Sequence, residues 1–326
     1  MLRFCLAAAL LIGAAGPTLA ADKVTFGTNW KAQAEHGGFY QAIATGIYAR
    51  HGLEVTLRPG GPQVNHSQLL AAGRIDFNMG GNLFNSYNYV TAKIPVVTVA
   101  AMFQKDPQVL ISHPGVGNDS LAALKGKPIM IANDGRASFW LWLKQKYGYS
   151  DDQLRPYTFN PAPFLADKNA TQQGYATSEP FSIMKAGVKP VVHLLADNGF
   201  ETYSTLIETQ AKTIKERPDV VQRFVDASIL GWHSYINGDP GPANALIKKD
   251  NPEMTDELIA FSLKTMKEMG LVDSGESKQN GIGAMNEARW QRFADFAVSV
   301  GIYPAGFDWK SAFTTQFVNK KVGMAK

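Results

Sequence analysis

Aromatic and polar side chains gather in the stretch from residue 27 to residue 57, whose pattern predicts a strand, a helix and a second strand. Asn29 and Trp30 end the first predicted strand, and His36 and Tyr40 flank the start of the helix. An aromatic ring can stack on a flat ligand, while an amide or an imidazole can hydrogen-bond to it. These four residues therefore predict half of a binding site for a small planar molecule.

Later segments supply candidates for the other half of the site. Gly81 and Asn82 follow the third predicted strand, where they fit a turn with an Asn helix cap and also a loop that turns backbone amides toward a ligand. Arg136 opens a later helix, at a place suited to an anion. Tyr175 and Glu179 end another strand, and a carboxylate there can accept hydrogen bonds from ring N–H or amino groups. Glu35, in the first loop, is interpreted as a solvated charge.

Motifs that would indicate catalysis or a metal are weak. Ser182 and Lys185 match S-x-x-K, but the companion S-D-N and K-T-G segments are missing. The sequence has no G-x-S-x-G, no P-loop and no complete G-x-G-x-x-G. Its histidines are too widely spaced for a compact metal motif. We therefore expect a binder without catalytic residues, metal or cofactor.

Two helices used below are predicted from local pattern. The first covers residues 37–50, and Gly37 and Gly38 allow another group to approach its start closely. The second lies late in the chain, and its apolar face is formed by Val221, Val225, Ile229, Trp232 and Ile236.

Strands and helices alternate in two successive sets, which predicts an α/β fold with parallel sheets. The chain is expected to leave a first lobe near residue 105, build a second lobe and return near residue 205. The predicted division is residues 22–105 plus 205–326 for lobe one and 106–204 for lobe two, with the helical C-terminal part packing on lobe one. Ligands of open α/β sheets lie beyond the carboxyl ends of the strands, so the candidates above should meet in the cleft between the lobes.

Residues 1–21 are typical of a secretory signal peptide, with Arg3 before a short apolar run and a small-residue exit. The single cysteine, Cys5, falls inside that segment, so the mature chain has none. Without Arg3 the chain has 31 basic against 28 acidic residues, a net charge of +3 with no basic cluster. This weak charge argues against nucleic acid and membrane surfaces as partners. The signal peptide predicts export, and we expect a monomer in the periplasm.

Several short motifs together resemble the solute-binding proteins of bacterial ABC importers, in the group named after the thiamine-pyrimidine precursor binders. They are Asn29–Trp30, His36–Ala42, Gly46–Tyr48, Gly52–Val55, Gly73–Phe77 and Gly174–Pro180. The resemblance implies a two-lobed periplasmic-binding fold (type 2) that closes on a solute and delivers it to a membrane permease with its ATPase. It covers the mature chain to about Thr209.

The resemblance leaves the ligand open. A pyrimidine-like, nitrogen-bearing ring is the first expectation, and a sulfonate or other small anion held by Arg136 is the alternative. A related eukaryotic branch synthesises a pyrimidine, using a lysine and a histidine where this sequence has Gly80 and Phe84. That departure favours a binder over a synthase. A periplasmic sensor domain is a further alternative.

Overall fold

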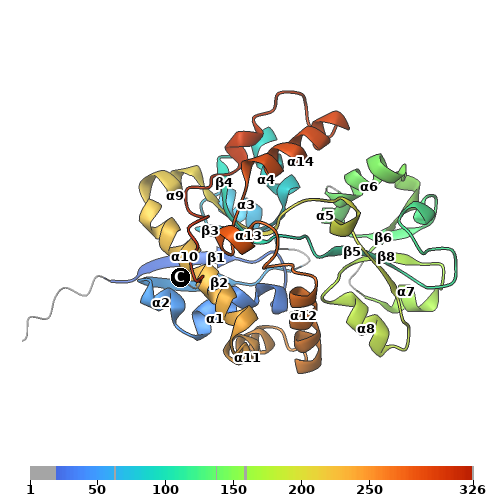
Figure 1. The fold of residues 1–326 in the computed structure, drawn as a ribbon, viewed down its shortest axis with the longest axis horizontal. Coiled ribbons are helices and arrows are strands. Elements are labelled where there is room, and N and C mark those ends of the chain that lie inside the picture. The colour runs from blue at the N-terminus through green and yellow to red at the C-terminus, as the bar shows by residue number, and fades with distance from the viewer. Residues whose placement is uncertain (1–19, 62–63, 137, 158–159, 325–326) are drawn as a thin grey trace, which may run out of the picture.

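The computed structural model describes residues 20–61, 64–136, 138–157 and 160–324, and contains two five-stranded sheets side by side (Figure 1). The first sheet, in spatial order, is β2 (Leu53–Arg58), β1 (Asp22–Gly27), β3 (Phe77–Asn82), β10 (Ser204–Gln210) and β4 (Val96–Phe103). The second is β7 (Leu154–Pro156), β6 (Ile129–Ile131), β8 (Thr171–Tyr175), β5 (Gln108–Ser112) and β9 (Val191–Leu194). With the helices around them, these sheets form lobe one and lobe two. Residues 1–19 of the predicted signal peptide lie outside the described residues.

Four of the five strands in each sheet are parallel to one another, as predicted, but one strand in each runs in the opposite direction, so both sheets are mixed. In lobe one β1 is parallel to β2 and β3, but β10 is antiparallel to β3 and β4. In lobe two β5 is antiparallel to β8 and β9. The cause is the return crossing: β4 leaves lobe one at Phe103, and β10 enters at Ser204, which pairs with Phe103. A strand that starts where its neighbour ends must run in the opposite direction.

Helices surround each sheet. Those of lobe one are α1 (Gly37–Ala44), α2 (Ile47–Arg50), α3 (His66–Ala71), α4 (Leu83–Thr91), α9 (Ala211–Glu216), α10 (Pro218–Asn237), α11 (Gly241–Asp250), α12 (Asp256–Glu268), α13 (Ser277–Asn280) and α14 (Glu287–Ser299). Those of lobe two are α5 (Asn133–Arg136), α6 (Phe139–Tyr147), α7 (Ala162–Ala166) and α8 (Glu179–Lys185). The single helix predicted over 37–50 is divided into α1 and α2, because Gly46 takes a left-handed φ of 70°. No described helix is long and apolar enough to cross a membrane.

Helix α10 forms much of the core of lobe one. Its predicted apolar face, Val221, Val225, Ile229, Trp232 and Ile236, is buried. The helix packs against α1 at very short range, since a Cβ on Gly231 would lie 2.2 Å from the carbonyl oxygen of Gly38. Gly38 therefore serves helix packing, whereas the sequence only indicated that some group approaches it closely.

Two segments connect the lobes, one between β4 and β5 and the other between β9 and β10. Arg289 of α14 ties them together: its Nη2 donates to the carbonyl oxygens of Gln104 (2.6 Å) and Thr202 (2.9 Å), one from each segment. The guanidinium also stacks over the ring of Tyr203 at 4.0 Å. The exact lobe boundaries stay a prediction.

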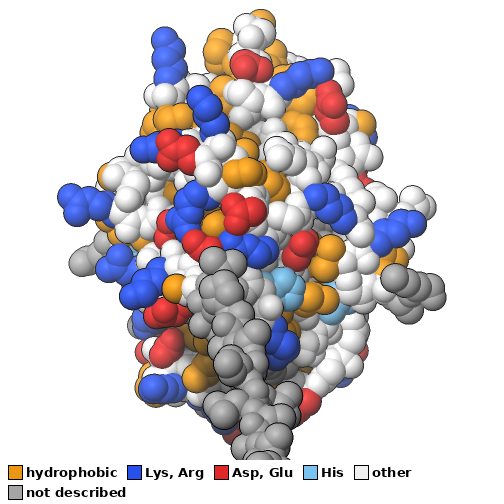
Figure 2. Space-filling model, turned by 90° about the vertical axis from the view of Figure 1, so that its left-hand side faces the viewer, with side chains coloured by type: hydrophobic (Ala, Val, Ile, Leu, Met, Phe, Trp, Pro, Cys, Tyr) orange, Lys and Arg blue, Asp and Glu red, His pale blue; other side chains and the backbone are white. Residues whose placement is uncertain are grey.

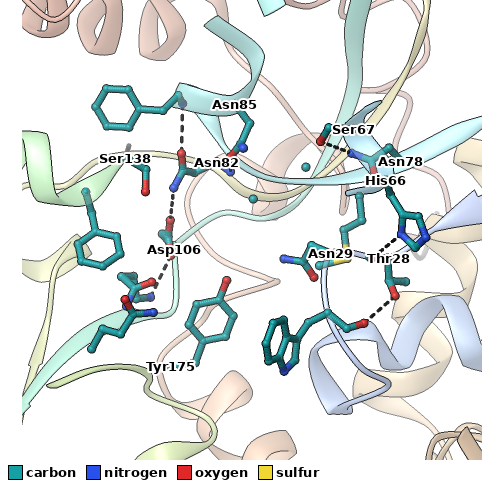
Figure 3. Close-up of a pocket in the computed structure, with 18 of the residues that line it drawn as sticks. Thr28, Asn29, His66, Ser67, Asn78, Asn82, Asn85, Asp106, Ser138 and Tyr175 are labelled. Carbon is teal, nitrogen blue, oxygen red and sulfur yellow. Dashed lines mark hydrogen bonds between the residues drawn. The ribbon is translucent and has the colours of Figure 1, made fainter. Parts of the chain in front are cut away.

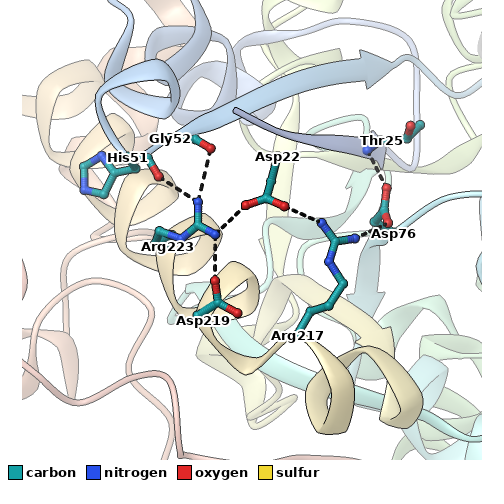
Figure 4. Close-up of polar contacts among 8 residues, drawn as sticks. All are labelled: Asp22, Thr25, His51, Gly52, Asp76, Arg217, Asp219 and Arg223. Atoms are coloured by element: carbon teal, nitrogen blue, oxygen red, sulfur yellow. Dashed lines mark hydrogen bonds and ion pairs between the residues drawn. The ribbon is translucent and has the colours of Figure 1, made fainter. Parts of the chain in front are cut away.

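The start of β1 is held by a cluster of ion pairs (Figure 4). Asp22 accepts from Arg217 at 3.2 Å and from Arg223 at 2.6 Å. Arg223 also pairs with Asp219, and Arg217 lies 3.6 Å from Asp76. The Arg223 guanidinium holds the pKa of Asp22 below its usual range. These contacts join the first strand to helices about 200 residues later in the chain.

The outer face of lobe one carries charges of both signs. Figure 2 shows Lys and Arg side chains interspersed with Asp and Glu on this face. Hydrophobic side chains on this face are scattered in small groups. The picture agrees with the small net charge of the sequence.

Candidate ligand-binding site

A cavity of about 310 Å³ lies between the lobes. Lobe one lines it with residues from the ends of β1 and β3 and from α3 and α4, namely Thr28, Asn29, Trp30, Gln33, Val64, Asn65, His66, Ser67, Asn78, Met79, Gly80, Gly81, Asn82, Phe84, Asn85 and Asn88. The first crossing and lobe two contribute Asp106, Gln108, Ser138, Phe139, Gln173, Gly174, Tyr175, Ser178 and Glu179. Figure 3 shows Asn29 and Tyr175 facing the cavity from opposite sides. Six of the nine predicted site residues, Asn29, Trp30, Gly81, Asn82, Tyr175 and Glu179, are among those that line the cavity.

Asn29 is oriented by His36. The buried imidazole donates from Nε2 to Asn29 Oδ1 at 3.1 Å, which leaves the Asn29 amide nitrogen as the group available to a ligand. Burial lowers the pKa of His36 to about 3, so the ring is neutral. His36 itself does not line the cavity. The structure therefore gives His36 a supporting position behind Asn29.

Asn82 both caps a helix and faces an acid. Its Oδ1 accepts from the backbone N–H of Phe84 at 3.1 Å, and Asn85 closes the capping box. Its Nδ2 donates to Asp106 Oδ2 at 3.4 Å. The structure confirms the Asn cap, and the same side chain lines the cavity.

Asp106 is a buried carboxyl in the first crossing. Its Oδ1 accepts from the backbone N–H of Gln108 at 2.9 Å. Burial raises the pKa of Asp106 to about 7, so the group can accept or donate a hydrogen bond near neutral pH. The sequence analysis did not select it, because no motif marks it.

Glu179 begins α8 and is fixed by two donors. Tyr157 Oη donates to Oε1 at 2.8 Å, and the backbone N–H of Tyr175 donates to Oε2 at 2.7 Å. Burial raises the pKa of Glu179 despite these hydrogen bonds. Each oxygen keeps a further lone pair for a ligand donor.

Two predicted residues lie away from the cavity. Tyr40 faces α11, where its hydroxyl donates to Asp250 Oδ2 at 2.8 Å. Arg136 ends the four-residue helix α5 and does not line the cavity. The chain turns after α5, so that Ser138 and Phe139 occupy the cavity wall instead.

Glu35 is not a solvated charge, as the sequence analysis had assumed. Its side chain is buried, with the residue 2% exposed, and it accepts a hydrogen bond from the hydroxyl of Thr177 in lobe two. Thr177 lies 142 residues later in the chain, so local sequence could not reveal this partner.

Other cavity residues missed from the sequence include His66, Asn78, Gln173 and Phe139. The alternation of side chains between the two faces of a strand could have identified two of these residues. Gln173 shares a face of β8 with Tyr175, and Asn78 shares a face of β3 with Asn82, since side chains two residues apart point the same way. His66, whose Nδ1 donates to Thr28 O at 2.8 Å, gave no such signal.

The charges of the cavity have one sign. Among the described residues that line it, Asp106 and Glu179 are acidic and none is Lys or Arg. Asn and Gln amides supply most of the remaining polar groups, and Trp30, Phe84, Phe139 and Tyr175 supply aromatic rings. No group of three or more His, Cys, Asp or Glu that could hold a metal occurs in the described part of the chain. The lining suits a flat, polar molecule without negative charge.

The two-lobed fold and the cavity between the lobes define a protein of the periplasmic-binding class. The chain belongs to the NMT1/THI5-like family, which matches residues 33–242.

Known proteins similar to this chain include binders and an enzyme. Riboflavin-binding protein RibY of Chloroflexus aurantiacus is 25% identical over 316 residues, covering 93% of this chain and 88% of RibY. The periplasmic aliphatic sulphonate binding protein SsuA from Escherichia coli has a similar structure, with a TM-score of 0.66, 15% identity, and coverage of 89% of this chain and 91% of SsuA. The 4-amino-5-hydroxymethyl-2-methylpyrimidine phosphate synthase of Schizosaccharomyces pombe is 28% identical over 112 residues, 34% of this chain and 32% of the enzyme.

Proposed function

We propose that this chain is the periplasmic solute-binding component of an ABC importer, and that it captures a planar, nitrogen-bearing solute without negative charge. The observation that carries the proposal is the cavity lining, which combines aromatic rings, amides and two acids with no Lys or Arg among the described residues. A pyrimidine or the pyrimidine-type ring of a flavin has this chemistry. Similarity to RibY supports the same class of ligand.

Trp30 from lobe one and Tyr175 from lobe two are proposed to stack on the ring. An aromatic pair contributes about 0.5–1.5 kcal/mol beyond its buried area. Asn29 and Asn82 are proposed to bind ring acceptors or carbonyl groups, and Glu179 to accept from a ring N–H or amino group. Asp106 joins this set on the evidence of its place in the cavity wall.

A sulfonate is the weaker candidate. The fold is shared with SsuA, but an anion in this cavity would face Asp106 and Glu179 with no described Lys or Arg among the lining residues. Like charges at short range disfavour such a complex. Only Arg136, outside the cavity wall, could be recruited by a rearrangement of α5.

We propose that the chain is not a pyrimidine synthase. The position assigned to the synthase lysine is Gly80, and the described lining residues include no lysine that could form an aldimine. The match to the synthase of Schizosaccharomyces pombe also covers only about a third of either chain. Appearance of an aldimine absorbance on mixing with pyridoxal phosphate would reverse this assignment.

The test is a titration of residues 22–326 followed by tryptophan fluorescence and calorimetry. We expect micromolar or tighter binding of riboflavin or of 4-amino-5-hydroxymethyl-2-methylpyrimidine, and none of an alkanesulfonate or nitrate. Trp30→Ala should weaken binding by about tenfold because a stacking surface is lost. Lys212→Ala, on the exposed surface of lobe one, serves as the matched control.

One outcome of this titration would contradict the proposed class of ligand. A response to alkanesulfonates alone, abolished by Arg136→Ala, would exclude the nitrogen-bearing ring and favour anion import. The permease partner, the periplasmic location after signal-peptide removal and a monomeric state belong to the same proposal. Size-exclusion chromatography with light scattering checks the last of these.

A further inference from the structure

The lobes also touch each other below the two crossing segments in Figure 1, where α8 of lobe two faces α12. The rings of Phe181 and Phe261 lie 5.4 Å apart across this contact. Lys185 and Glu257 form an exposed ion pair of 2.8 Å at its edge. This contact between α8 and α12 is separate from the two crossing segments.

A buried polar cluster occupies the interior of this contact. Thr177 of lobe two is fully buried, and its hydroxyl donates to the carboxylate of Glu35 in lobe one. The carbonyl oxygen of Thr177 accepts from Ser262 Oγ of α12 at 2.6 Å. One residue of lobe two is thus held by two elements of lobe one, through both its side chain and its backbone.

Burial is the main cause that raises the pKa of Glu35 and so favours its neutral form, and the acid Glu179 across the contact adds to it. The hydrogen bond from Thr177 acts in the opposite direction but does not outweigh burial. On its own side of the contact Glu35 faces the phenol of Tyr235 in α10. The adjacent His36 is neutral, because burial lowers its pKa to about 3. The ion pair of Lys185 with Glu257 is exposed at the edge, so it offers little compensation to a buried charge.

We propose that Glu35, Thr177 and Ser262 form a latch that holds the lobes closed and weakens when the Glu35 carboxyl ionises. In the closed form a neutral carboxyl satisfies Thr177 without placing a charge in the contact. In an open form Glu35 meets water and ionises at no comparable cost. The latch is independent of which solute occupies the cavity.

The direction of the pH dependence follows from proton linkage. Burial raises the pKa of Glu35 from 4.5 to about 7 in the closed form, so that form binds the extra proton. The closed-to-open ratio is therefore highest below pH 4.5, falls by up to about tenfold per pH unit as the pH rises, and levels off above pH 7. Asp106, which also has its pKa raised to about 7, and Glu179 could add a dependence of their own, so the test must separate them from Glu35.

The test measures lobe separation in the protein without solute. Residues 22–326 contain no cysteine, so nitroxide labels can be placed at Lys125→Cys in lobe two and Lys212→Cys in lobe one, both exposed. Pulsed electron resonance then gives the distance distribution at pH 5 and pH 8. In the labelled parent we expect the short distance to dominate at pH 5 and a longer distance to grow at pH 8.

Four variants in this labelled background decide the proposal. Glu35→Gln keeps an acceptor for Thr177 without a charge, so the short distance should persist at both pH values. Thr177→Val removes the hydroxyl at constant shape and should lower the closed-to-open ratio at pH 5 by about fivefold, whereas Thr177→Ser should not. Asp106→Asn should leave the pH response in place.

The proposal is overturned if Glu35→Gln responds to pH as the parent does, or if Thr177→Val has the distances of Thr177→Ser. Loss of the response in Asp106→Asn together with its persistence in Glu35→Gln would assign the switch to the cavity acid instead. Melting curves confirm that each variant is folded before its distances are compared. Because no solute is present, failure here leaves the proposed function untouched.

Discussion

At the scale of single residues, the cavity depends on side chains that the solute would not touch. Asn29 lines the cavity, but the buried ring of His36 decides which end of its amide faces inward. Glu179 is likewise fixed by Tyr157 and by the backbone of Tyr175. Preorganised groups of this kind bind with less loss of side-chain entropy than mobile ones.

Replacing His36 should therefore weaken binding without abolishing it. His36→Leu removes the donor to Asn29 and lets the amide rotate, for which we expect about five- to tenfold lower affinity, the value of one hydrogen bond. Calorimetric titration with the solute found in the screen gives the measurement. His51→Leu, at the end of α2, removes a ring whose Nδ1 bonds to Ile47 O, and this variant should bind as the parent does. Equal affinity in both variants would show that Asn29 is held without His36.

At the scale of elements, glycines allow α1 and α10 of lobe one to approach each other closely. Gly231 of α10 lies against the backbone of Gly38 in α1, and a Cβ on Gly38 would meet the ring of Trp232 at 2.2 Å. Phe39 packs edge-to-face on the same ring, with centroids 5.8 Å apart. The motif His36–Gly37–Gly38–Phe39 thus positions the first helix, and through it the loop that carries Asn29 and Trp30.

The close approach predicts that Gly231→Ala destabilises the protein, although alanine favours a helix by about 1 kcal/mol. The added methyl would lie 2.2 Å from a backbone oxygen, so α1 and α10 must separate, with an expected net loss of about 2 kcal/mol. Urea unfolding measures the loss. Gly61→Ala, whose Cβ would meet nothing nearer than 4.0 Å, should change the unfolding free energy by less than about 0.5 kcal/mol. A stabilised Gly231→Ala would disprove the tight packing.

At the scale of the whole molecule, the relation between the lobes depends on two crossing segments and on Arg289. Its guanidinium binds carbonyl oxygens of both segments, so their relative position is fixed from lobe one. The latch of Glu35, Thr177 and Ser262 fixes the lobes at a second place. Motion between the lobes must therefore pivot on the crossing segments that Arg289 binds, and it must break the latch of Glu35, Thr177 and Ser262.

Removing the hinge tie should loosen the crossings. For Arg289→Met we expect about 2 kcal/mol lower stability and faster amide exchange over residues 104–108 and 200–204, because three charge-assisted hydrogen bonds to backbone carbonyl oxygens are lost. Hydrogen exchange followed by mass spectrometry gives the measurement. Arg292→Met is the matched control, since Arg292 is exposed on the same helix and reaches only Glu201, at 4.0 Å. Equal exchange in both variants would remove Arg289 from the hinge.

Local patterns were sufficient for part of this structure. The spacing of Val221, Val225, Ile229, Trp232 and Ile236 predicted the buried face of α10, and strand ends placed Asn29, Trp30, Tyr175 and Glu179 near one another. Both predictions use only a short stretch of chain and the general geometry of helices and strands.

The predictions that failed needed long-range information. Tyr40 turns toward Asp250, 210 residues away, and Glu35 toward Thr177, 142 residues away. The direction of β10 is set by the place where the chain re-enters lobe one from lobe two, and the order of strands and helices along the sequence does not contain this information. The direction of the Arg136 side chain depends on where helix α5 ends, because a shift of one or two residues in that end would point a different side chain at the cavity.

The position of β10 also sets an order in which the chain can assemble. All five strands of lobe two lie in one continuous segment, from Gln108 to Leu194, whereas the sheet of lobe one has β10 between β3 and β4. Because the chain is made from its N-terminus, β3 and β4 exist before β10, the strand that joins them, which follows β4 by about 100 residues. Lobe two can therefore complete its sheet first, while β3 and β4 keep unpaired edges that would attract a chaperone or a neighbouring chain. The cavity, which both lobes line, is therefore incomplete until Ser204 to Gln210 enters the sheet of lobe one.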